Sequence, residues 1–360
     1  MISPQALRLL LASLIVVSGL AAQAAPPEPR VLWRTNPKTQ DPLATFAYDS
    51  SLILRYVIMG ERLDPLTGTR LARVAGAGLF ASAGADTLSH VGGKLGGHKN
   101  LVYAPRWQLA VDGARPRLLA THAGAAFIAT EEPDPDSEGQ QQRAILTAVT
   151  VEAGEKLWQT RLQSPEPQPG SVVAKHGLLL YDGWALSLAD GKVRWTVEDS
   201  VIGFHWDLNA PSGELEGWYH DQARVIDAAS GRVLRRYGYL KDRWVTTPPI
   251  RHAGLMLVGT DLGLVALGAS GVSEKYQVAS DSVTAPLQRV GELVWFLSRK
   301  AVHTVDIATG GERCRFQPPE GAPKALLVVG DVVVVTAGFS DATTVMALAC
   351  EPAPPASLRN

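Results

Sequence analysis

The sequence has almost no net charge and very few cysteines. Its 34 Lys and Arg residues are matched by 35 Asp and Glu residues, which gives a net charge of −1. This balance gives no overall basic charge of the kind with which proteins bind nucleic acid or anionic lipid. The only cysteines are Cys314 and Cys350, so no Cys-x-x-Cys motif exists, and no His-Glu-x-x-His motif is present either. The common zinc and redox motifs are therefore missing.

Helical periodicity is missing as well. Beyond the N-terminal segment, short alternating or continuous apolar runs take the place of the 3.6-residue spacing of a helix. Glycine and proline are frequent, with 34 and 24 residues, as expected when turns recur about every dozen residues. The chain is 46% hydrophobic, enough for a large buried core. The sequence predicts an all-β protein.

Glycine recurs at regular intervals of about 40 residues. The glycines in this series are Gly68, Gly113, Gly154, Gly191, Gly231, Gly271 and Gly310. A period of about 40 residues built from short strands is typical of a β-propeller, in which each repeat is one four-stranded blade. We predict an eight-bladed propeller. Seven blades is the alternative, because the second repeat, 81–117, is the least regular.

The residues before these glycines are those of a hairpin turn. Asp306 precedes Gly310 within Asp-Ile-Ala-Thr-Gly, and Asp227 precedes Gly231 in the same way. An Asp side chain accepts hydrogen bonds from the backbone N–H groups that follow it, which starts the turn. Glycine then supplies the positive φ needed to leave the turn. Each glycine is thus expected to link two strands of a blade.

A tryptophan follows two of the glycines by four residues. Trp158 follows Gly154, and Trp195 follows Gly191. We expect these two side chains to pack between blades rather than to contact a ligand. In the other repeats the same slot holds Ala72, Arg117, Arg235, Lys275 and Cys314.

Each end of the chain holds part of a blade. The last repeat ends with an apolar strand at 345–349, and no further strand follows it. The segment 30–34 looks like the missing strand, with Trp33 in the slot of Trp158. We predict that this N-terminal strand completes the last blade, which closes the ring without an open sheet edge.

The N-terminus has the pattern of a signal peptide. The apolar run from Leu9 to Leu20 is too short to span a bilayer comfortably, and small residues at Ala22 and Ala24 fit a cleavage site. We expect a signal peptide at 1–24, a propeller at 25–350 and a flexible tail at 351–360. An uncleaved membrane anchor is the alternative. The mature chain is expected to be monomeric and not inserted into a membrane.

Cys314 and Cys350 both lie in the last two repeats. Export would permit a disulfide between them. A pair of buried thiols is the alternative, since spacing in the sequence does not give the Cα separation that a disulfide needs.

The repeat resembles that of the quinoprotein-like propellers, whose pattern is Asp-x-x-Thr-Gly-x-x-x-Trp. The segment 306–310 matches the first part of this pattern, and the segments 154–158 and 191–195 match its last part. The resemblance covers the chain from about residue 28 to residue 350. It implies a propeller of PQQ-like repeats.

Two branches of that family differ in function. One contains dehydrogenases that hold pyrroloquinoline quinone (PQQ) and calcium on the ring axis. None of their catalytic, cofactor-binding or metal-binding residues can be placed on this sequence, and their adjacent cysteines are missing. The other branch is non-catalytic and includes the periplasmic propeller lipoprotein of the outer-membrane β-barrel assembly machine. The complete repeat array without an assembled active site favours the second branch, although no lipid-attachment Cys stands at the expected cleavage point.

Two segments depart from the repeat. The acidic segment 131–139 imitates the start of a calcium-binding loop, but Ile145 stands where a Glu ligand is needed, so we expect a solvated hairpin tip. The other segment mixes aromatic, histidine and acidic residues, as a partner surface would. Packing between blades is the interpretation we favour for it. Its residues are His205, Trp206, Asp207, Trp218 and His220.

Three functions stay open. The favoured one is a non-catalytic scaffold that binds other periplasmic or envelope proteins, in envelope or outer-membrane protein assembly, without a cofactor or nucleic acid. A small PQQ- and calcium-dependent oxidoreductase is the alternative. A carbohydrate-binding propeller is a second alternative, because the chain has nine tryptophans.

Overall fold

The computed structural model describes most of the chain between Pro26 and Cys350. The described ranges are 26–35, 44–48, 51–55, 59–75, 79–83, 86–99, 104–135, 142–163, 170–197, 205–207, 214–219, 221–237, 240, 242–268, 273–339 and 342–350. The expected signal peptide and C-terminal tail lie outside these ranges. Within them, no helix is long and apolar enough to cross a membrane.

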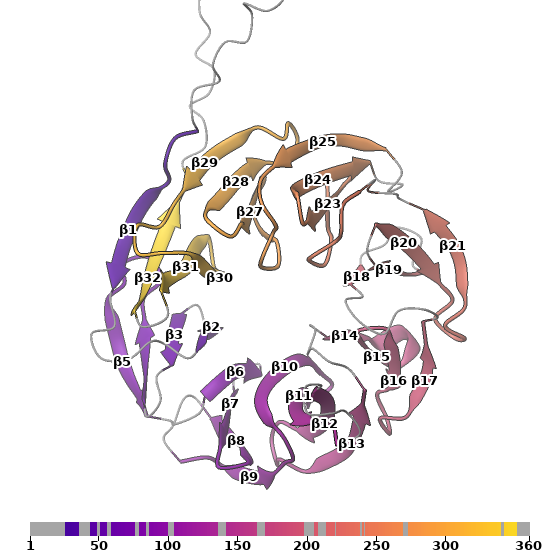
Figure 1. Cartoon of the computed structure of the whole chain (residues 1–360). Helices are drawn as coiled ribbons and strands as arrows, with labels where there is room; N and C mark the ends of the chain where they lie inside the picture. The colour runs from indigo at the N-terminus through magenta and orange to yellow at the C-terminus, as the bar shows by residue number, and fades with distance from the viewer. Residues whose placement is uncertain are drawn as a thin grey trace, which may run out of the picture.

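Eight four-stranded antiparallel sheets surround a central axis (Figure 1). The prediction of an eight-bladed β-propeller is confirmed, and the seven-bladed alternative is wrong. In each blade the first strand lies nearest the axis and the fourth lies at the outside of the ring. One short 3-10 helix, η1 (Ala174–His176), interrupts the fourth blade.

The first four blades follow one another along the chain. Blade 1 contains β2 (Ala44–Tyr48), β3 (Ser51–Arg55), β4 (Met59–Leu63) and β5 (Arg70–Ala75). Blade 2 contains β6 (Leu79–Ala83), β7 (Asp86–Val91), β8 (Lys94–Lys99) and β9 (Trp107–Ala110). Blade 3 contains β10 (Ala114–His122), β11 (Ala125–Pro133), β12 (Gln142–Thr150) and β13 (Lys156–Leu162). Blade 4 contains β14 (Gly170–Val173), β15 (Leu178–Tyr181), β16 (Trp184–Ser187) and β17 (Val193–Thr196).

The remaining blades return to the start of the chain. Blade 5 contains β18 (His205–Asp207), β19 (Leu215–Tyr219), β20 (Gln222–Ile226) and β21 (Val233–Tyr237). Blade 6 contains β22 (Ile250–His252), β23 (Leu255–Thr260), β24 (Gly263–Gly268) and β25 (Glu274–Ala279). Blade 7 contains β26 (Gln288–Val290), β27 (Leu293–Leu297), β28 (Val302–Asp306) and β29 (Glu312–Phe316). Blade 8 contains β30 (Pro323–Val329), β31 (Val332–Phe339), β32 (Ala342–Ala349) and β1 (Arg30–Thr35).

The N-terminal strand closes the ring, as predicted. Strand β1 pairs antiparallel with β32, and Val31 lies opposite Leu348 while Trp33 lies opposite Ala347. The last blade therefore consists of strands from both ends of the chain. Its sheet has the same four strands as the others, so no blade is left incomplete.

The antiparallel order gives the ring two different faces. The turns that join the first to the second strand and the third to the fourth strand lie on one face, which we call the clasp face. The turns between the second and third strands and the connections between blades lie on the other face, the connection face. Five glycines of the series lie in third-to-fourth-strand turns on the clasp face: Gly68, Gly154, Gly191, Gly231 and Gly310. Gly113 lies on the connection face, and Gly271 is outside the described residues.

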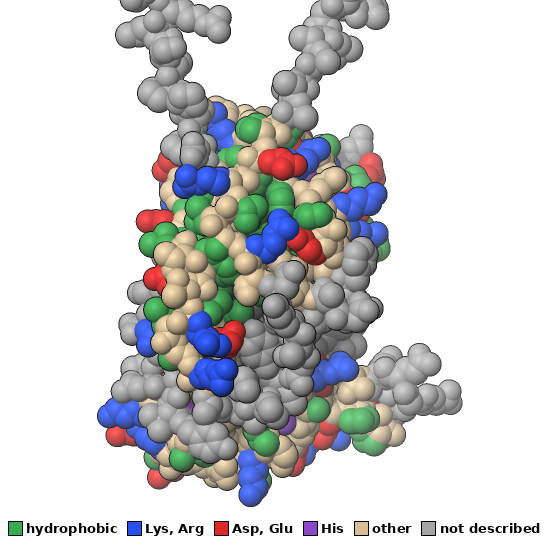
Figure 2. All heavy atoms as spheres, turned by 90° about the vertical axis from the view of Figure 1, so that its left-hand side faces the viewer, with side chains coloured by type: hydrophobic (Ala, Val, Ile, Leu, Met, Phe, Trp, Pro, Cys, Tyr) green, Lys and Arg blue, Asp and Glu red, His purple; other side chains and the backbone are tan. Residues whose placement is uncertain are grey.

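The outer strands carry mostly basic residues. Every outer strand except β9 contains Lys or Arg, whereas Asp or Glu occurs only in β25 and β29. Charged side chains are scattered over the flank seen in Figure 2, which is the left-hand side of Figure 1. Charges on an exposed strand oppose pairing with the edge of another molecule.

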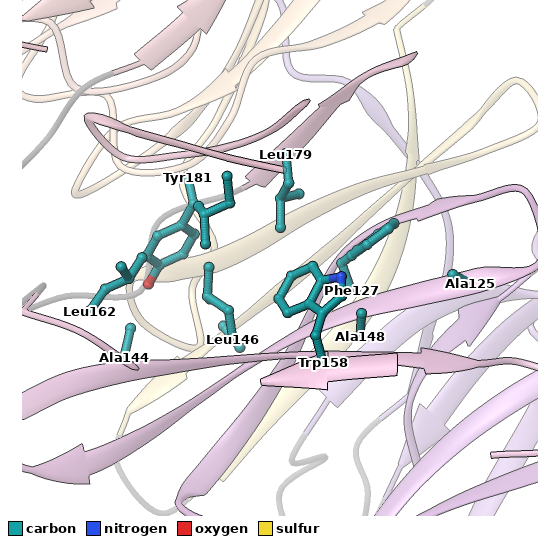
Figure 3. Packing of buried hydrophobic residues seen from close by; sticks show 11 residues of the cluster. Ala125, Phe127, Ala144, Leu146, Ala148, Trp158, Leu162, Leu179 and Tyr181 are labelled. Atoms are coloured by element: carbon teal, nitrogen blue, oxygen red, sulfur yellow. The ribbon is translucent and has the colours of Figure 1, made fainter. Parts of the chain in front are cut away.

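The hydrophobic core lies between neighbouring blades. Between blades 3 and 4, Phe127 and Trp158 face Leu179 and Tyr181 in a buried cluster (Figure 3). The ring centroids of Phe127 and Trp158 lie 5.8 Å apart. Because each sheet packs its two faces on two neighbours, the blades hold one another in the ring.

Trp158 and Trp195 each tie their own blade to the next one, which confirms that they pack between blades. The Trp158 indole N–H donates to the carbonyl oxygen of Leu188 at 2.9 Å. A Cβ atom added to Gly191 would lie only 2.4 Å from the Trp158 ring, so the turn must have glycine there. We call this contact an aromatic clasp: an outer-strand ring covers the turn glycine of the next blade and donates to a carbonyl in that turn.

The same clasp occurs at five junctions. In each case the donor lies 2.6–2.9 Å from the carbonyl oxygen. The donor–acceptor pairs are Trp33–Pro65, Trp107–Val151, Trp158–Leu188, Trp195–Ala228 and Tyr276–Ile307.

Two of the slot positions expected from the sequence were wrong. Gly113 lies between β9 and β10 rather than in a third-to-fourth-strand turn, so Arg117 does not follow such a turn. The clasp residue of blade 2 is instead Trp107, which lies opposite Gly97. In blade 6, Tyr276 occupies the slot in place of Lys275, because the register places Ala266 opposite Tyr276.

The three remaining junctions have no aromatic residue in the slot. Cys314 forms a disulfide with Cys350, with Cα atoms 6.1 Å apart, and so joins blade 7 to blade 8. The slots of blades 1 and 5 hold Ala72 and Arg235, and Arg235 forms an ion pair with Glu214 of its own blade. The junctions between blades 1 and 2 and between blades 5 and 6 are therefore unclasped.

Candidate functional site

The five residues that the sequence analysis considered as a partner surface belong to blade 5. His205 and Trp206 lie on β18 and Trp218 on β19, and all three side chains are buried. The indole N–H of Trp206 donates to the carbonyl oxygen of Asp182 in blade 4 at 2.6 Å. Asp207 lies at the end of β18, whereas its side chain and His220 are outside the described part. The described side chains thus pack between blades and do not form an exposed surface.

His205 is held in its neutral form by its surroundings. Burial lowers the pKa of His205 to about 4, because the charged imidazolium would lose its hydration. At neutral pH this side chain is an uncharged part of the core. It has the character of a packing residue and not of a proton donor.

A buried ion pair crosses the unclasped junction between blades 5 and 6. Arg251 on β22 lies 2.9 Å from Glu216 on β19, and the Glu216 side chain is 2% exposed. The Trp218 indole N–H donates to the same Glu216 carboxylate at 3.2 Å. Because the two charges are separated by 35 residues, no local pattern in the sequence indicates them. At this junction the ion pair adds to an apolar cluster in which Trp218 of blade 5 packs with Met256 and Val258 of blade 6.

The acidic segment 131–139 begins at the end of β11, on the connection face. Two of its described carboxylates form ion pairs with arginines: Glu131 lies 3.4 Å from Arg115, and Glu132 lies 2.6 Å from Arg143 and 3.0 Å from Arg161. These carboxylates therefore form ion pairs with neighbouring strands. Positions 136–139 lie outside the described ranges.

A calcium ion like that of the dehydrogenase branch is bound by oxygen ligands, mainly carboxylates. Among the described residues, no group of three or more His, Cys, Asp or Glu side chains lies close enough to hold a metal ion. No chemistry through PQQ is therefore derived from these residues.

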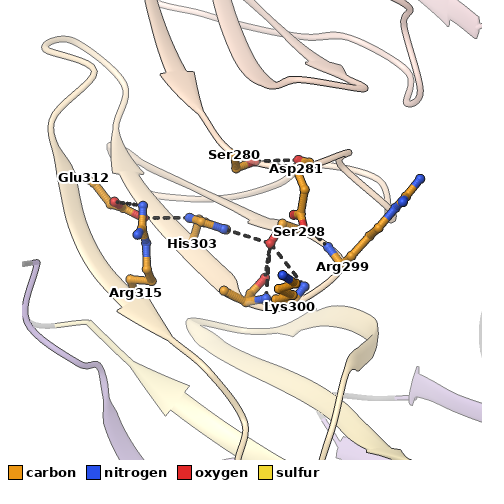
Figure 4. Close-up of polar contacts among 9 residues, drawn as sticks. Ser280, Asp281, Ser298, Arg299, Lys300, His303, Glu312 and Arg315 are labelled. Carbon is orange, nitrogen blue, oxygen red and sulfur yellow. Dashed lines mark hydrogen bonds and ion pairs between the residues drawn. The ribbon is translucent and has the colours of Figure 1, made fainter.

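A Ser–His–Glu arrangement in blade 7 has the distances of a hydrolase triad (Figure 4). The Nε2 atom of His303 lies 3.0 Å from Ser298 Oγ, and its Nδ1 atom lies 2.6 Å from Glu312 Oε1. Burial works to raise the pKa of Glu312, but hydrogen bonds from His303 and Arg315 outweigh it and lower the pKa.

The serine of this arrangement is not available to a substrate. Ser298 is 2% exposed, and its hydroxyl group accepts the backbone N–H of Ala301 at 3.1 Å within the β27–β28 turn. The His303 ring is stacked on Phe296, with ring centroids 4.6 Å apart. The group thus fixes a turn and a core position, as buried polar networks commonly do.

The largest exposed aromatic side chain in the described part is Trp244, on the connection face of blade 6. It is 61% exposed, and it lies in residues 238–249, the longest connection between two blades. Leu262, in the adjoining β23–β24 turn, is 46% exposed. We call Trp244 and Leu262 the Trp244 patch. It borders the unclasped junction between blades 5 and 6.

The backbone beneath this patch is held in place. The Trp244 N–H donates to Asp261 Oδ1 at 2.7 Å, and the Asp261 N–H donates to the Trp244 carbonyl oxygen at 3.0 Å. Val245 forms a β-bridge with Thr260, and the Thr246 N–H donates to the Gly259 carbonyl oxygen at 2.9 Å. Trp244 is therefore presented on a strand-like segment. Nothing in the sequence near Trp244 indicates its exposure, which depends on how residues 244–246 pair with the end of β23.

Solved propellers share this architecture at low sequence identity. A computationally designed protein, Ika8, has a TM-score of 0.66 and 14% identity over 90% of this chain and 98% of its own. BamB from Moraxella catarrhalis has a TM-score of 0.60 and 15% identity over 88% of this chain and 99% of its own. Sqt1 from Saccharomyces cerevisiae has a TM-score of 0.66 and 12% identity over 89% of this chain and 99% of its own. These similarities show the fold alone.

No protein-family model matches the sequence, and no curated protein matches it significantly. The argument for function therefore rests on the residues of this chain.

Proposed function

We propose that the chain is a non-catalytic, protein-binding propeller scaffold that acts in the periplasm. The signal-peptide pattern of residues 1–24 supports export, and the resemblance to the non-catalytic quinoprotein-like branch supports a role in envelope or outer-membrane protein assembly. The similarity of the fold to BamB agrees with this branch. Fold alone does not assign function, so a binding site on this chain is needed as well.

The Trp244 patch is the observation that carries the proposal. A Trp side chain has a large apolar surface, and covering the exposed part of Trp244 would remove on the order of 100 Å² of apolar surface from water, worth about 3 kcal/mol. Because its backbone is held by three hydrogen bonds to the end of β23 and the following turn, little order has to be gained on binding. Rigid, exposed Trp residues are the usual centres of binding energy in protein interfaces.

The buried Ser–His–Glu group of blade 7 favours a binding role for the chain over a catalytic one. Its nucleophile position is buried and engaged by a turn, whereas a catalytic Ser must reach the substrate. The Trp244 patch, in turn, is exposed and has no chemistry of its own. A binding role needs no rearrangement of Trp244 and Leu262.

A photo-crosslinking amino acid at position 244 tests the proposal. Placed there and expressed in the periplasm, it should link the propeller to one discrete partner protein. The same probe at position 66 is the matched control, because Leu66 is 63% exposed but lies in a turn of the clasp face. The purified partner should then bind the unmodified propeller saturably, and Trp244→Ala should weaken binding about 10-fold or more, whereas Leu66→Ala should not.

Three results would count against the scaffold. Equal cross-linking from positions 244 and 66 would remove the specific site. Turnover of alcohols or sugars after addition of PQQ and calcium would replace the scaffold by the oxidoreductase alternative. Binding of a polysaccharide that Trp244→Ala abolishes would favour the carbohydrate-binding alternative.

A further inference from the structure

The disulfide occupies the place of an aromatic clasp. Cys314 lies opposite Thr304, as Trp158 lies opposite Ala148 in blade 3, so Cys314 is in the clasp slot of blade 7. The partner cysteine is also in an equivalent position. In blade 3 the carbonyl that accepts a clasp belongs to Val151, three residues after Ala148.

Blade 8 repeats this spacing. Ala347 is the residue opposite Trp33, and Cys350 follows it by the same three positions. The disulfide thus links the ring-bearing position of blade 7 to the carbonyl-bearing position of blade 8. A covalent bond stands where five other junctions have a hydrogen bond and a stacked ring.

The junction between blades 7 and 8 differs from the others in one respect, which explains why it has a disulfide in place of an aromatic clasp. In blade 8 the third and fourth strands, β32 and β1, come from opposite ends of the chain, so no turn connects them. The N-terminal segment also reaches blade 7, where the Arg315 N–H donates to the carbonyl oxygen of Pro27 at 3.1 Å. Both chain ends therefore meet beside Cys314. Strand β1 is held to β32 by backbone pairing and by side-chain packing, without a connecting turn.

We propose that the Cys314–Cys350 disulfide is a redox-dependent latch of the ring: when it is oxidised it fixes β32 to blade 7 and keeps β1 paired, and when it is reduced β1 and β32 separate before the other blades open. Cys314 is 4% exposed, whereas Cys350 is partly exposed. An external dithiol therefore reaches the Cys350 sulfur first.

The chemistry is a thiol–disulfide exchange with a dithiol as the reductant. A thiolate of the dithiol attacks Cys350 Sγ, the Sγ–Sγ bond breaks, and Cys314 leaves as a thiolate that takes up a proton. The second thiolate of the dithiol then attacks the mixed disulfide and releases Cys350. Two electrons pass to the protein and the dithiol becomes a cyclic disulfide. The latch therefore stays closed only in an oxidising compartment.

Hydrogen exchange on the purified protein tests the latch. After reduction with dithiothreitol and alkylation of both thiols, exchange at the amides of β1 and β32 should rise about 10-fold or more, while exchange in blades 3 and 4 stays unchanged. The apparent melting temperature should fall by about 5 °C, since a closed loop of this length is released. Unchanged exchange in β1 would overturn the proposal, and so would an equal rise in all blades.

Two variants separate a latch from general damage by reductant. Cys314→Ser/Cys350→Ser should show the exchange pattern of the reduced protein without any reductant and should not respond to it. Cys314→Trp/Cys350→Ala restores the ring of the aromatic clasp, so it should keep β1 protected and be insensitive to dithiothreitol. If the double serine variant does not fold, the reduced and alkylated protein still gives the answer. If hydrogen exchange in β1 is as fast in the tryptophan variant as in the serine variant, the disulfide is not equivalent to an aromatic clasp.

Discussion

The junction between blades 3 and 4 and the junction between blades 5 and 6 join similar sheets by different means. In the first, Trp158 covers Gly191 and donates to the Leu188 carbonyl oxygen. In the second, Arg235 occupies the slot and pairs within its own blade, and the ion pair of Glu216 and Arg251 crosses the junction. The contact between blades 3 and 4 repeats at other junctions and follows a regular spacing in the sequence. The ion pair between blades 5 and 6 does not follow that spacing. The exposed Trp244 lies beside the junction between blades 5 and 6.

The unclasped junctions also have a fixed relation to each other. One follows blade 1 and the other follows blade 5, so they lie on opposite sides of the eight-bladed ring (Figure 1). Within the arc of blades 2 to 5, and within the arc of blades 6 to 1, every junction has an aromatic clasp or the disulfide. The ring thus consists of two clasped halves.

We expect the largest difference in the free energy of unfolding between the two junctions for substitutions in the clasp slot. Trp158→Ala removes a ring that is buried in the core between blades 3 and 4, and it should lower the free energy of unfolding by about 4 kcal/mol. Arg235→Ala, in the same slot of blade 5, removes an exposed ion pair and should cost less than about 1 kcal/mol. Urea unfolding of both variants gives the two values. Similar losses would mean that the slot is equally important at both junctions.

The buried ion pair should give the next largest effect. Glu216→Ala leaves Arg251 buried without its carboxylate, and it should destabilise the protein by about 3–4 kcal/mol in urea unfolding. The exposed pair of Glu61 and Arg70 is the control, and Glu61→Ala should cost less than about 1 kcal/mol. Glu216→Leu with Arg251→Met should recover most of the loss. If Glu216→Ala costs no more than the control, the pair does not hold this junction.

Blade 5 should also make stability depend on pH. Because the folded pKa of His205 is about 4 and the unfolded pKa is about 6.5, only the unfolded chain takes up this proton between those pH values. His205 therefore lowers the free energy of unfolding by about 3 kcal/mol as the pH falls from about 6.5 to about 4. Urea unfolding across this range should show a shallower slope for His205→Gln. The same slope in both proteins would mean that His205 is not buried as a neutral group.

The smallest effect concerns the turn glycine. Gly191→Ala places a Cβ atom against the Trp158 ring and also strains a residue with φ of 69°, so we expect a loss of about 2 kcal/mol. Gly177 has a similar φ of 64°, but a Cβ atom there would meet nothing within 4 Å. Gly177→Ala should therefore cost about 1 kcal/mol, the part due to backbone strain alone. Thermal or urea unfolding measures the difference, and equal losses would show that the ring contact adds nothing.

The features that repeat could be predicted from the sequence. The turn glycines and Trp158 obey a spacing that every blade needs, so one sequence contains several copies of the same signal. Ring closure followed from this spacing too, since Trp33 fits the slot although its turn is missing. Trp107 was missed because Gly113 falls near the expected period but lies in another part of the blade.

The features that occur once could not be predicted in this way. Glu216 and Arg251 are brought together by the packing of two blades, and nothing near either residue indicates its partner. The composition around Trp206 and Trp218 fitted both a partner surface and packing between blades, and the two side chains are buried, as the favoured second interpretation expected. Trp244 lies on the surface where residues 244–246 pair with the end of β23 and the turn after it. Exposure of an aromatic residue is decided by contacts that are distant in sequence.

The pairing of β1 with β32 also affects the order in which the molecule can form. Val31 lies opposite Leu348, so β1 has no partner strand until β32 has been made and, if the chain is exported, has crossed the membrane. Contacts of such long sequence separation form late and slow down folding. A chain that is interrupted before β32 would keep seven blades but leave β1 unpaired. Only a chain that includes β32 can therefore complete the ring.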